Sequence, residues 1–164
     1  MFCPPVGEMF KLADSVADGT RPAAAWGTSV TPGNNTYGSY AALISGASVT
    51  DDAHGILINI NSVSTSTAAK DCIVTIGIDP AGGASYTAFI EHLLCSCAGA
   101  YASAQCGAGG VNYYFPVRVP SGSSIAAKAS VNNATVGTVR VAVTLYRTTR
   151  PMGSVMLVIR LPPS

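Results

Sequence analysis

Runs of alternating apolar and polar residues recur along this chain and restrict the folds open to it. In 55–61, Ile56, Ile58 and Ile60 stand at every second position. In 138–146 four apolar residues, three valines and a leucine, alternate with more polar ones in the same way. A period of two places such residues on one face of an extended strand. The pattern therefore predicts half-buried β-strands rather than helices.

Nine segments have the character of short strands: 26–30, 40–44, 55–61, 72–78, 86–95, 112–119, 124–130, 138–146 and 155–159. Segment 86–95 also fits a helical period, but we favour a strand. Turn-forming residues at 31–35 and 79–83 separate neighbouring segments. Eight or nine short strands with turns between them predict an all-β, antiparallel β-sandwich or barrel. A jelly roll is the natural eight-stranded member of this group.

The N-terminal segment 1–24 differs from the rest of the chain. Residues 10–18 have a weak helical appearance, and turn-forming residues follow them at 18–22. We expect 1–24 to be an extended arm, with at most one short helical turn, that either binds a neighbouring subunit or frays. The remaining residues, 25–164, are predicted to form a single β-sandwich domain, as the length of 164 residues allows.

Charge is scarce, which excludes several classes of protein. Lys and Arg total 9, Asp and Glu total 8, and the formal net charge is +1. Nucleic-acid binding needs clustered basic residues, and disorder needs high charge with low hydrophobicity. No stretch approaches the length of a membrane helix, and 1–8 lacks a secretory signal. A surface this poor in charge favours packing against other subunits over a solitary secreted domain.

The cysteines do not match a disulfide framework or a complete zinc site. There are five of them: Cys3, Cys72, Cys95, Cys97 and Cys106. A zinc site at 95–106 would lack a fourth ligand unless His92 supplied it. We expect buried thiols and no metal or cofactor, and the pairing of the five stays open.

No catalytic motif surrounds the two histidines, His54 and His92. The adjacent acids Asp51 and Asp52 precede the strand at 55–61, where a turn-forming role is simpler than calcium binding or acid–base chemistry. We therefore expect the protein not to be an enzyme.

Six tyrosines lie near predicted turns or strand ends: Tyr37, Tyr40, Tyr86, Tyr101, Tyr113 and Tyr114. Exposed tyrosine rings serve carbohydrate sites and protein interfaces, while buried ones serve the core. The sequence does not separate these roles.

Four strings resemble small β-rich virion proteins of tailed bacteriophages: WGTSVTPGNNTYGSY at 26–40, IDPAGGASY at 78–86, YFPVRVPSGSSIAAKAS at 114–130 and TVRVAVTLY at 138–146. Proteins of this kind decorate capsids or form head fibres and tail components. The resemblance implies a jelly-roll-like sandwich, self-association (often as trimers) and no catalysis. It transfers no site residues.

The leading hypothesis is a structural virion protein, most directly a capsid decoration or cement protein assembled in the host cytoplasm. Its partners would be the major capsid protein or other virion proteins and copies of itself, with a trimer favoured, and neither nucleic acid nor a membrane. Contacts are expected from the arm and the apolar tail at 155–163, through Phe2, Phe10, Leu12, Val155, Leu157 and Ile159. The alternative is a tail or fibre module that binds a host-surface glycan or receptor through the tyrosine-bearing loops and the small-residue loop 98–110.

Overall fold

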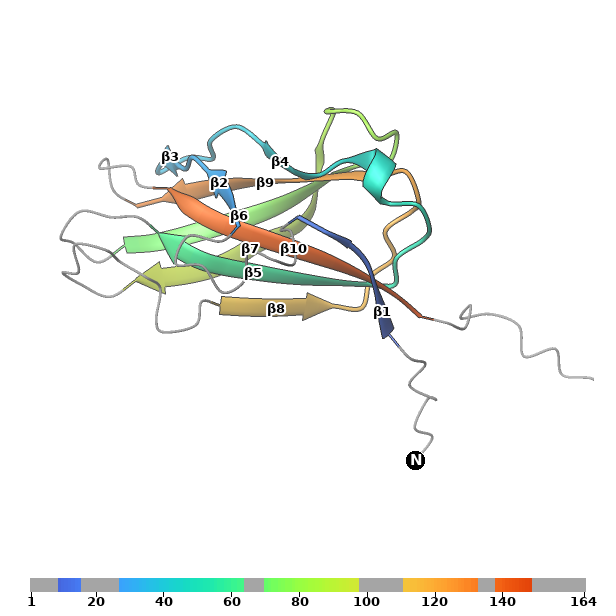
Figure 1. Ribbon diagram of the computed structural model, residues 1–164. Helices are drawn as coiled ribbons and strands as arrows, with labels where there is room; N and C mark the ends of the chain where they lie inside the picture. Colours follow the sequence, from blue (N-terminus) through green and yellow to red (C-terminus); the bar gives the residue numbers. More distant parts are fainter. Residues whose placement is uncertain (1–8, 16–26, 64–69, 98–110, 133–137, 149–164) are drawn as a thin grey trace, which may run out of the picture.

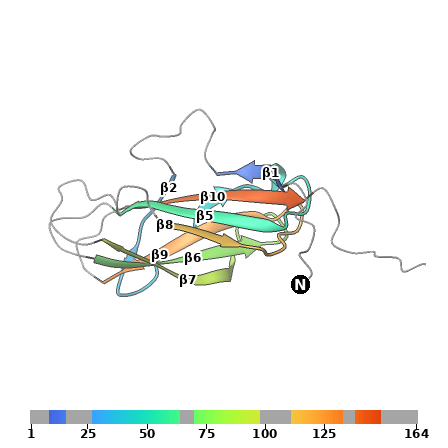
Figure 2. The same cartoon turned by 90° about the horizontal axis from the view of Figure 1, so that it is seen from below.

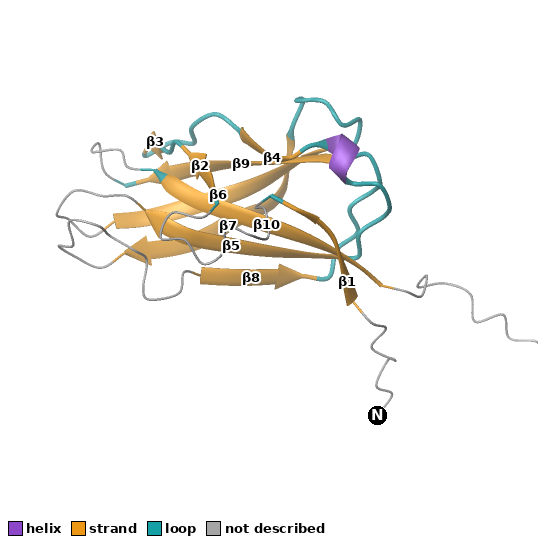
Figure 3. Ribbon diagram, viewed as in Figure 1, coloured by secondary structure: helices purple, strands orange, loops and turns teal. Residues whose placement is uncertain are grey.

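Two β-sheets packed face to face make up the computed structural model of the protein (Figure 1). The structure describes residues 9–15, 27–63, 70–97, 111–132 and 138–148. Seen from below, the sheets form two layers, with β10, β5 and β8 in one and β9, β6 and β7 in the other (Figure 2). One 3-10 turn, η2 (Gly46–Ser48), is the only helical element of the described residues (Figure 3). The expectation of an all-β sandwich is confirmed.

The first sheet has the order β1-β10-β5-β8, and β2 also pairs with β10. Its strands are β1 (Met9–Asp14), β2 (Thr28–Val30), β5 (Gly55–Val63), β8 (Val111–Phe115) and β10 (Val139–Thr148). Strands β1 and β2 contact different lengths of β10, with β1 beside 144–148 and β2 beside 139–141. They therefore follow one another along a single edge of β10.

The second sheet has the order β3-β9-β6-β7, and β4 also pairs with β9. Its strands are β3 (Gly33–Asn34), β4 (Ala41–Ile44), β6 (Lys70–Asp79), β7 (Thr87–Cys97) and β9 (Ser124–Val131). Strand β3 lies parallel to the end of β9, and β4 lies antiparallel to its beginning. All other strand pairs of both sheets are antiparallel.

The core between the sheets comes from the period of two in the sequence. Ile56, Ile58 and Ile60 of β5 are each fully buried, as are Val139, Val141, Val143 and Leu145 of β10. The second sheet adds the inward residues of β6 and β9: Cys72, Val74, Ile76, Ile78, Ile125, Ala127, Ala129 and Val131. Burying a large aliphatic side chain contributes about 1.5–3 kcal/mol relative to leaving it exposed. The alternating runs therefore both specify the strands and hold the sheets together.

Three loops meet at one end of the sandwich through glycines. A Cβ atom on Gly46 would overlap the carbonyl oxygen of Gly122 and lie 2.8 Å from the Cα of Gly82. Gly82 and Gly122 also have φ angles of +74° and +79°, which side-chain-bearing residues rarely adopt. The glycines thus allow the β4–β5, β6–β7 and β8–β9 loops to pack backbone against backbone.

The structure corrects one reading of the sequence and confirms another. Residues 9–14 form strand β1, not a helical turn, because the open edge of β10 supplies hydrogen-bonding partners along their length. The ambiguous segment 86–95 is strand β7, as favoured. The rest of the predicted arm and the predicted strand 155–159 lie outside the described residues.

Candidate functional site

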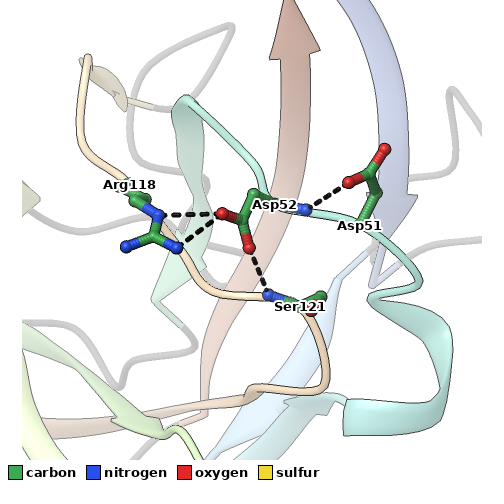
Figure 4. Close-up of polar contacts among 4 residues, drawn as sticks. All are labelled: Asp51, Asp52, Arg118 and Ser121. Carbon is green, nitrogen blue, oxygen red and sulfur yellow. Dashed lines mark hydrogen bonds and ion pairs between the residues drawn. The ribbon is translucent and has the colours of Figure 1, made fainter. Parts of the chain in front are cut away.

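The acidic pair at 51–52 forms the most connected polar network among the described side chains (Figure 4). Asp52 lies in the β4–β5 loop and faces the β8–β9 loop. Its Oδ2 accepts hydrogen bonds from Nε and Nη2 of Arg118, at 2.9 and 2.6 Å. Its Oδ1 accepts the backbone N–H of Ser121 at 2.9 Å. Both carboxylate oxygens are thereby engaged in joining two loops.

Asp51 extends the same network to the end of β10. Its Oδ1 accepts the N–H of Asp52 at 2.9 Å, and its Oδ2 accepts Nη1 of Arg147 at 3.0 Å. Backbone contacts reinforce the join, because Ala53 and Val119 exchange hydrogen bonds of 2.9 and 3.0 Å. We call Asp51, Asp52, Arg118 and Arg147 the loop clamp. Its role agrees with the turn-forming interpretation of the two acids.

The electrostatics of Asp52 follow from these contacts. The hydrogen bond from the Ser121 backbone, followed by that from Arg118, holds the pKa of the Asp52 carboxyl below its ordinary value of 3.8. A carboxylate kept ionised in this way is a poor general acid near neutral pH. The clamp is suited to holding loops rather than to moving protons.

The two histidines belong to different parts of the fold, His54 to the β4–β5 loop and His92 to strand β7. His54 precedes β5 and donates its backbone N–H to the carbonyl of Tyr146 at 2.7 Å, while its Nδ1 is buried without a hydrogen-bond partner. His92 is exposed on β7 with a φ of +59°, at a bulge in this edge strand. Among the described residues, no three His, Cys, Asp or Glu side chains gather as metal ligands would.

Two of the five cysteines lie side by side on adjacent strands of the second sheet. Cys72 of β6 and Cys95 of β7 are register partners, and both are buried in the core. Burial raises the pKa of the Cys72 thiol to about 12, with a smaller contribution from Cys95, and raises that of Cys95 to about 11. Both match the buried thiols that the sequence favoured. Cys97 ends β7, and Cys3 and Cys106 lie outside the described residues.

Of the six residues predicted to make contacts, the structure describes two. Phe10 of β1 is 42% exposed, and Leu12 is partly buried against the core. Phe2, Val155, Leu157 and Ile159 lie outside the described residues.

Two exposed apolar residues lie near Phe10, and nothing in the sequence indicates that they meet. Met9 is 43% and Tyr114 is 46% exposed, and the Tyr114 hydroxyl lies 3.8 Å from the Met9 sulfur. These two residues stand at opposite edges of the first sheet, and only the pairing of β1, β10, β5 and β8 brings them together. Leu94, 54% exposed, lies apart from them on β7 of the second sheet.

Three tyrosines gather with a lysine on the outer face of the second sheet. The Nζ of Lys128 lies 4.8 Å from the ring centroids of both Tyr37 and Tyr40. The rings of Tyr40 and Tyr86 lie 5.4 Å apart and are tilted by 48°. We call these four residues the tyrosine cluster. The sequence singled out its tyrosines, but it gave no signal for Lys128.

The other two described tyrosines near predicted turns have different surroundings. Tyr113 packs against the core, and its hydroxyl donates to the carbonyl of Leu94 at 2.5 Å, which joins β8 to β7. Tyr114 contacts Met9, as above. Tyr101 lies outside the described residues. The structure thus separates core, edge and surface roles that the sequence left open.

Comparison with known proteins gives no family for this chain. None of the helical structure in the described residues is long and apolar enough to cross a membrane. No protein-family model matches the sequence, and neither a curated protein nor a solved structure matches the chain.

Proposed function

We propose that this chain is a structural virion protein, most directly a capsid decoration or cement protein of a tailed phage. It would act through subunit contacts and not through catalysis. The observation that carries the proposal is the apolar exposure around β1. Three of the four exposed large apolar side chains of the described residues, Met9, Phe10 and Tyr114, lie on β1 or touch it. Exposed apolar side chains that gather in this way mark interaction surfaces.

The strand order supports the proposal at the level of the fold. We infer that the sandwich is a jelly roll, with β1 and β2 counted as one strand and β3 and β4 as another. Each sheet is then four strands wide, and the chain changes sheets at every connection except that between β6 and β7. Viral capsid proteins use this architecture, although lectins and cupins use it too. The fold alone therefore does not decide the function.

Low charge also favours a role in a larger assembly. Only 10% of the residues are charged, and four of the charged side chains are engaged in the loop clamp. Self-association, with a trimer favoured, belongs to the same proposal, as does contact with the major capsid protein.

The proposal is tested with a variant that carries both Met9→Ser and Phe10→Ser. Purified protein is sedimented with capsids that lack it, and bound copies are counted. We expect the variant to lose at least about tenfold in affinity, because each buried apolar side chain contributes ~1.5–3 kcal/mol. Leu94→Ser is the matched control, since it removes a comparably exposed apolar residue from the other sheet, and it should bind normally.

Undiminished binding by the double variant, with thermal unfolding like that of the control, would contradict a contact role for β1. Loss of binding by both variants would also contradict it, since the effect would not be specific to β1.

The second candidate function is a tail or fibre module that binds a glycan. The tyrosine cluster is the observation that favours it, because aromatic rings outside the core are typical of sugar-binding surfaces. A position on the tail would accompany this function.

A further inference from the structure

We propose that the tyrosine cluster binds a saccharide that carries a carboxylate, a hexuronic or sialic acid residue, and that Lys128 recognises the acidic group. This inference deepens the second candidate function and rests on it. It does not depend on where the protein sits in a particle.

Backbone pairing assembles the cluster from three separate parts of the chain. Tyr37 and Tyr40 come from the segment that runs along the free edge of β9, where the N–H of Gly38 donates to the carbonyl of Ala129 at 2.9 Å. Lys128 comes from β9 itself and Tyr86 from the residue before β7. None of the three tyrosines belongs to the core between the sheets. Their rings therefore serve the outer surface.

Small residues of the second sheet lie beneath the cluster and let the rings approach the backbone closely. Gly77 of β6 lies under Tyr40, and a Cβ atom at this position would be 2.5 Å from the ring carbon Cε1. The same Cβ would be 3.1 Å from the Cβ of Tyr86. Ala126, the register partner of Gly77, is fully buried although it lies outside the core cluster. Small residues thus leave room for two rings on the outer face.

Lys128 is an uncompensated charge within this aromatic surface. Among the described residues it contacts the faces of two rings, and no carboxylate pairs with it. Ring faces stabilise an ammonium group but leave its N–H donors open to an acceptor. An anionic ligand would supply that acceptor through charge-assisted hydrogen bonds, which are stronger than neutral ones.

The hydroxyl of Thr75 is a second polar group at the cluster, and it has no hydrogen-bond partner among the described residues. Thr75 is the register partner of Lys128 and lies on the same outer face, since its neighbours Val74 and Ile76 point into the core. Its side chain is 1% exposed, and its hydroxyl makes no hydrogen bond. A buried hydroxyl without a hydrogen-bond partner destabilises the folded chain. Within the described part of the chain, the outer face of β6 and β9 at this cluster therefore holds an unpartnered hydroxyl beside the unpaired ammonium group of Lys128.

A sugar fits these groups better than an acidic protein side chain does. The hydroxyls of Tyr37, Tyr40 and Tyr86 make no hydrogen bond with any described residue, whereas those of Tyr113 and Tyr114 contact other groups. An Asp or Glu would engage Lys128 alone. A sugar acid presents a carboxylate, an apolar ring face and several hydroxyls within one ring.

The test measures binding of the full chain by isothermal titration calorimetry. The probes are an oligogalacturonate of five residues and its methyl ester, which keeps the sugar and its linkage but removes the charge. Sialyllactose and lactose form a second acidic and neutral pair. We expect at least one acidic probe to bind and its neutral counterpart to bind at least about tenfold more weakly.

The variants assign the effect to Lys128. Lys128→Met should weaken acidic-sugar binding at least about tenfold, whereas Lys128→Arg should stay within about threefold because it keeps the charge. Tyr37→Ala should weaken binding of both members of a pair, since it removes a ring face. Lys11→Met, an exposed lysine of the other sheet, is the matched control and should bind like the parent.

Three results would overturn the inference: no binding of either acidic probe, equal binding of acidic and neutral probes, or unchanged binding by Lys128→Met. If Lys128→Met instead removes the protein from particles, the cluster is a protein contact and the sugar proposal fails. Loss of sugar binding with normal attachment to particles would leave the structural role intact, so the two proposals fail separately.

Discussion

At the scale of the residue, Asp52 shows why an acidic pair in a sequence is weak evidence for chemistry. Its two oxygens accept three hydrogen bonds from two partners on another loop. The same contacts stabilise the ionised carboxylate, which is what a structural ion pair requires and what a general acid does not.

Replacing Asp52 by asparagine should destabilise the protein at neutral pH and reduce the dependence of its stability on pH. The pKa of Asp52 is lower in the folded chain than its ordinary value of 3.8. The carboxylate therefore contributes stability above about pH 4, and this contribution is lost as the pH falls through the folded pKa. Urea unfolding between pH 3 and pH 7 would measure the difference between parent and variant.

Asp51→Asn is the control for this change, because Asp51 binds a single arginine at the exposed end of the clamp. It should have the smaller effect. Identical pH profiles for the parent and Asp52→Asn would contradict the role given to the clamp.

The buried cysteines should be inert towards alkylation while the chain is folded. The raised pKa values of Cys72 and Cys95, about 12 and about 11, leave almost no thiolate at pH 8. Tandem mass spectrometry after treatment with iodoacetamide should find both residues unmodified in the native protein and both modified in urea. Rapid native modification of Cys72 would show that β6 is not buried as described.

At the scale of the element, the period of two determines most of the fold. Strands β5, β6, β9 and β10 all lie within about two residues of the segments that the alternation predicts. The alternation did not predict strands β1 and β3, because both are short edge strands with few inward-facing apolar residues. Their extended conformation comes from open hydrogen-bonding groups on β10 and β9, which lie far away in the sequence.

The period of two also predicts which substitutions in β5 are costly. Ile58→Ala should lower the free energy of unfolding by about 2–5 kcal/mol, because it leaves a cavity between the sheets. Leu57→Ala, one residue away on the partly exposed outer face, should cost less than half as much. Urea unfolding of the two variants tests the comparison, and equal losses would contradict the assigned faces.

The two candidate sites differ in how far the sequence predicts them. The two acids of the loop clamp are conspicuous in the sequence because they are adjacent. Their arginine partners are not, since Arg118 lies 66 residues from Asp52 and Arg147 lies 96 residues from Asp51. The tyrosine cluster depends on the register of β6 with β9, which places Gly77 under Tyr40 and Lys128 against the ring faces of Tyr37 and Tyr40. Neither set of partners has a local signal.

At the scale of the whole molecule, β1 connects the proposed arm to the body of the sandwich. Deleting 1–24 would remove a strand that pairs with β10 as well as any subunit contacts. If the truncated chain failed to bind capsids, the result would not show whether a subunit contact or the fold itself had been lost. Point changes at Met9 and Phe10 avoid this problem because they keep the backbone of β1.

The most direct test of the proposed virion role is the number of copies per particle. Quantitative mass spectrometry of purified virions would compare this chain with the major capsid protein. A decoration or cement protein should be present in numbers comparable to the capsid protein. A count about one or two orders of magnitude lower would move the chain to the tail or a vertex and favour the glycan-binding candidate. Absence from the particles would contradict both virion proposals.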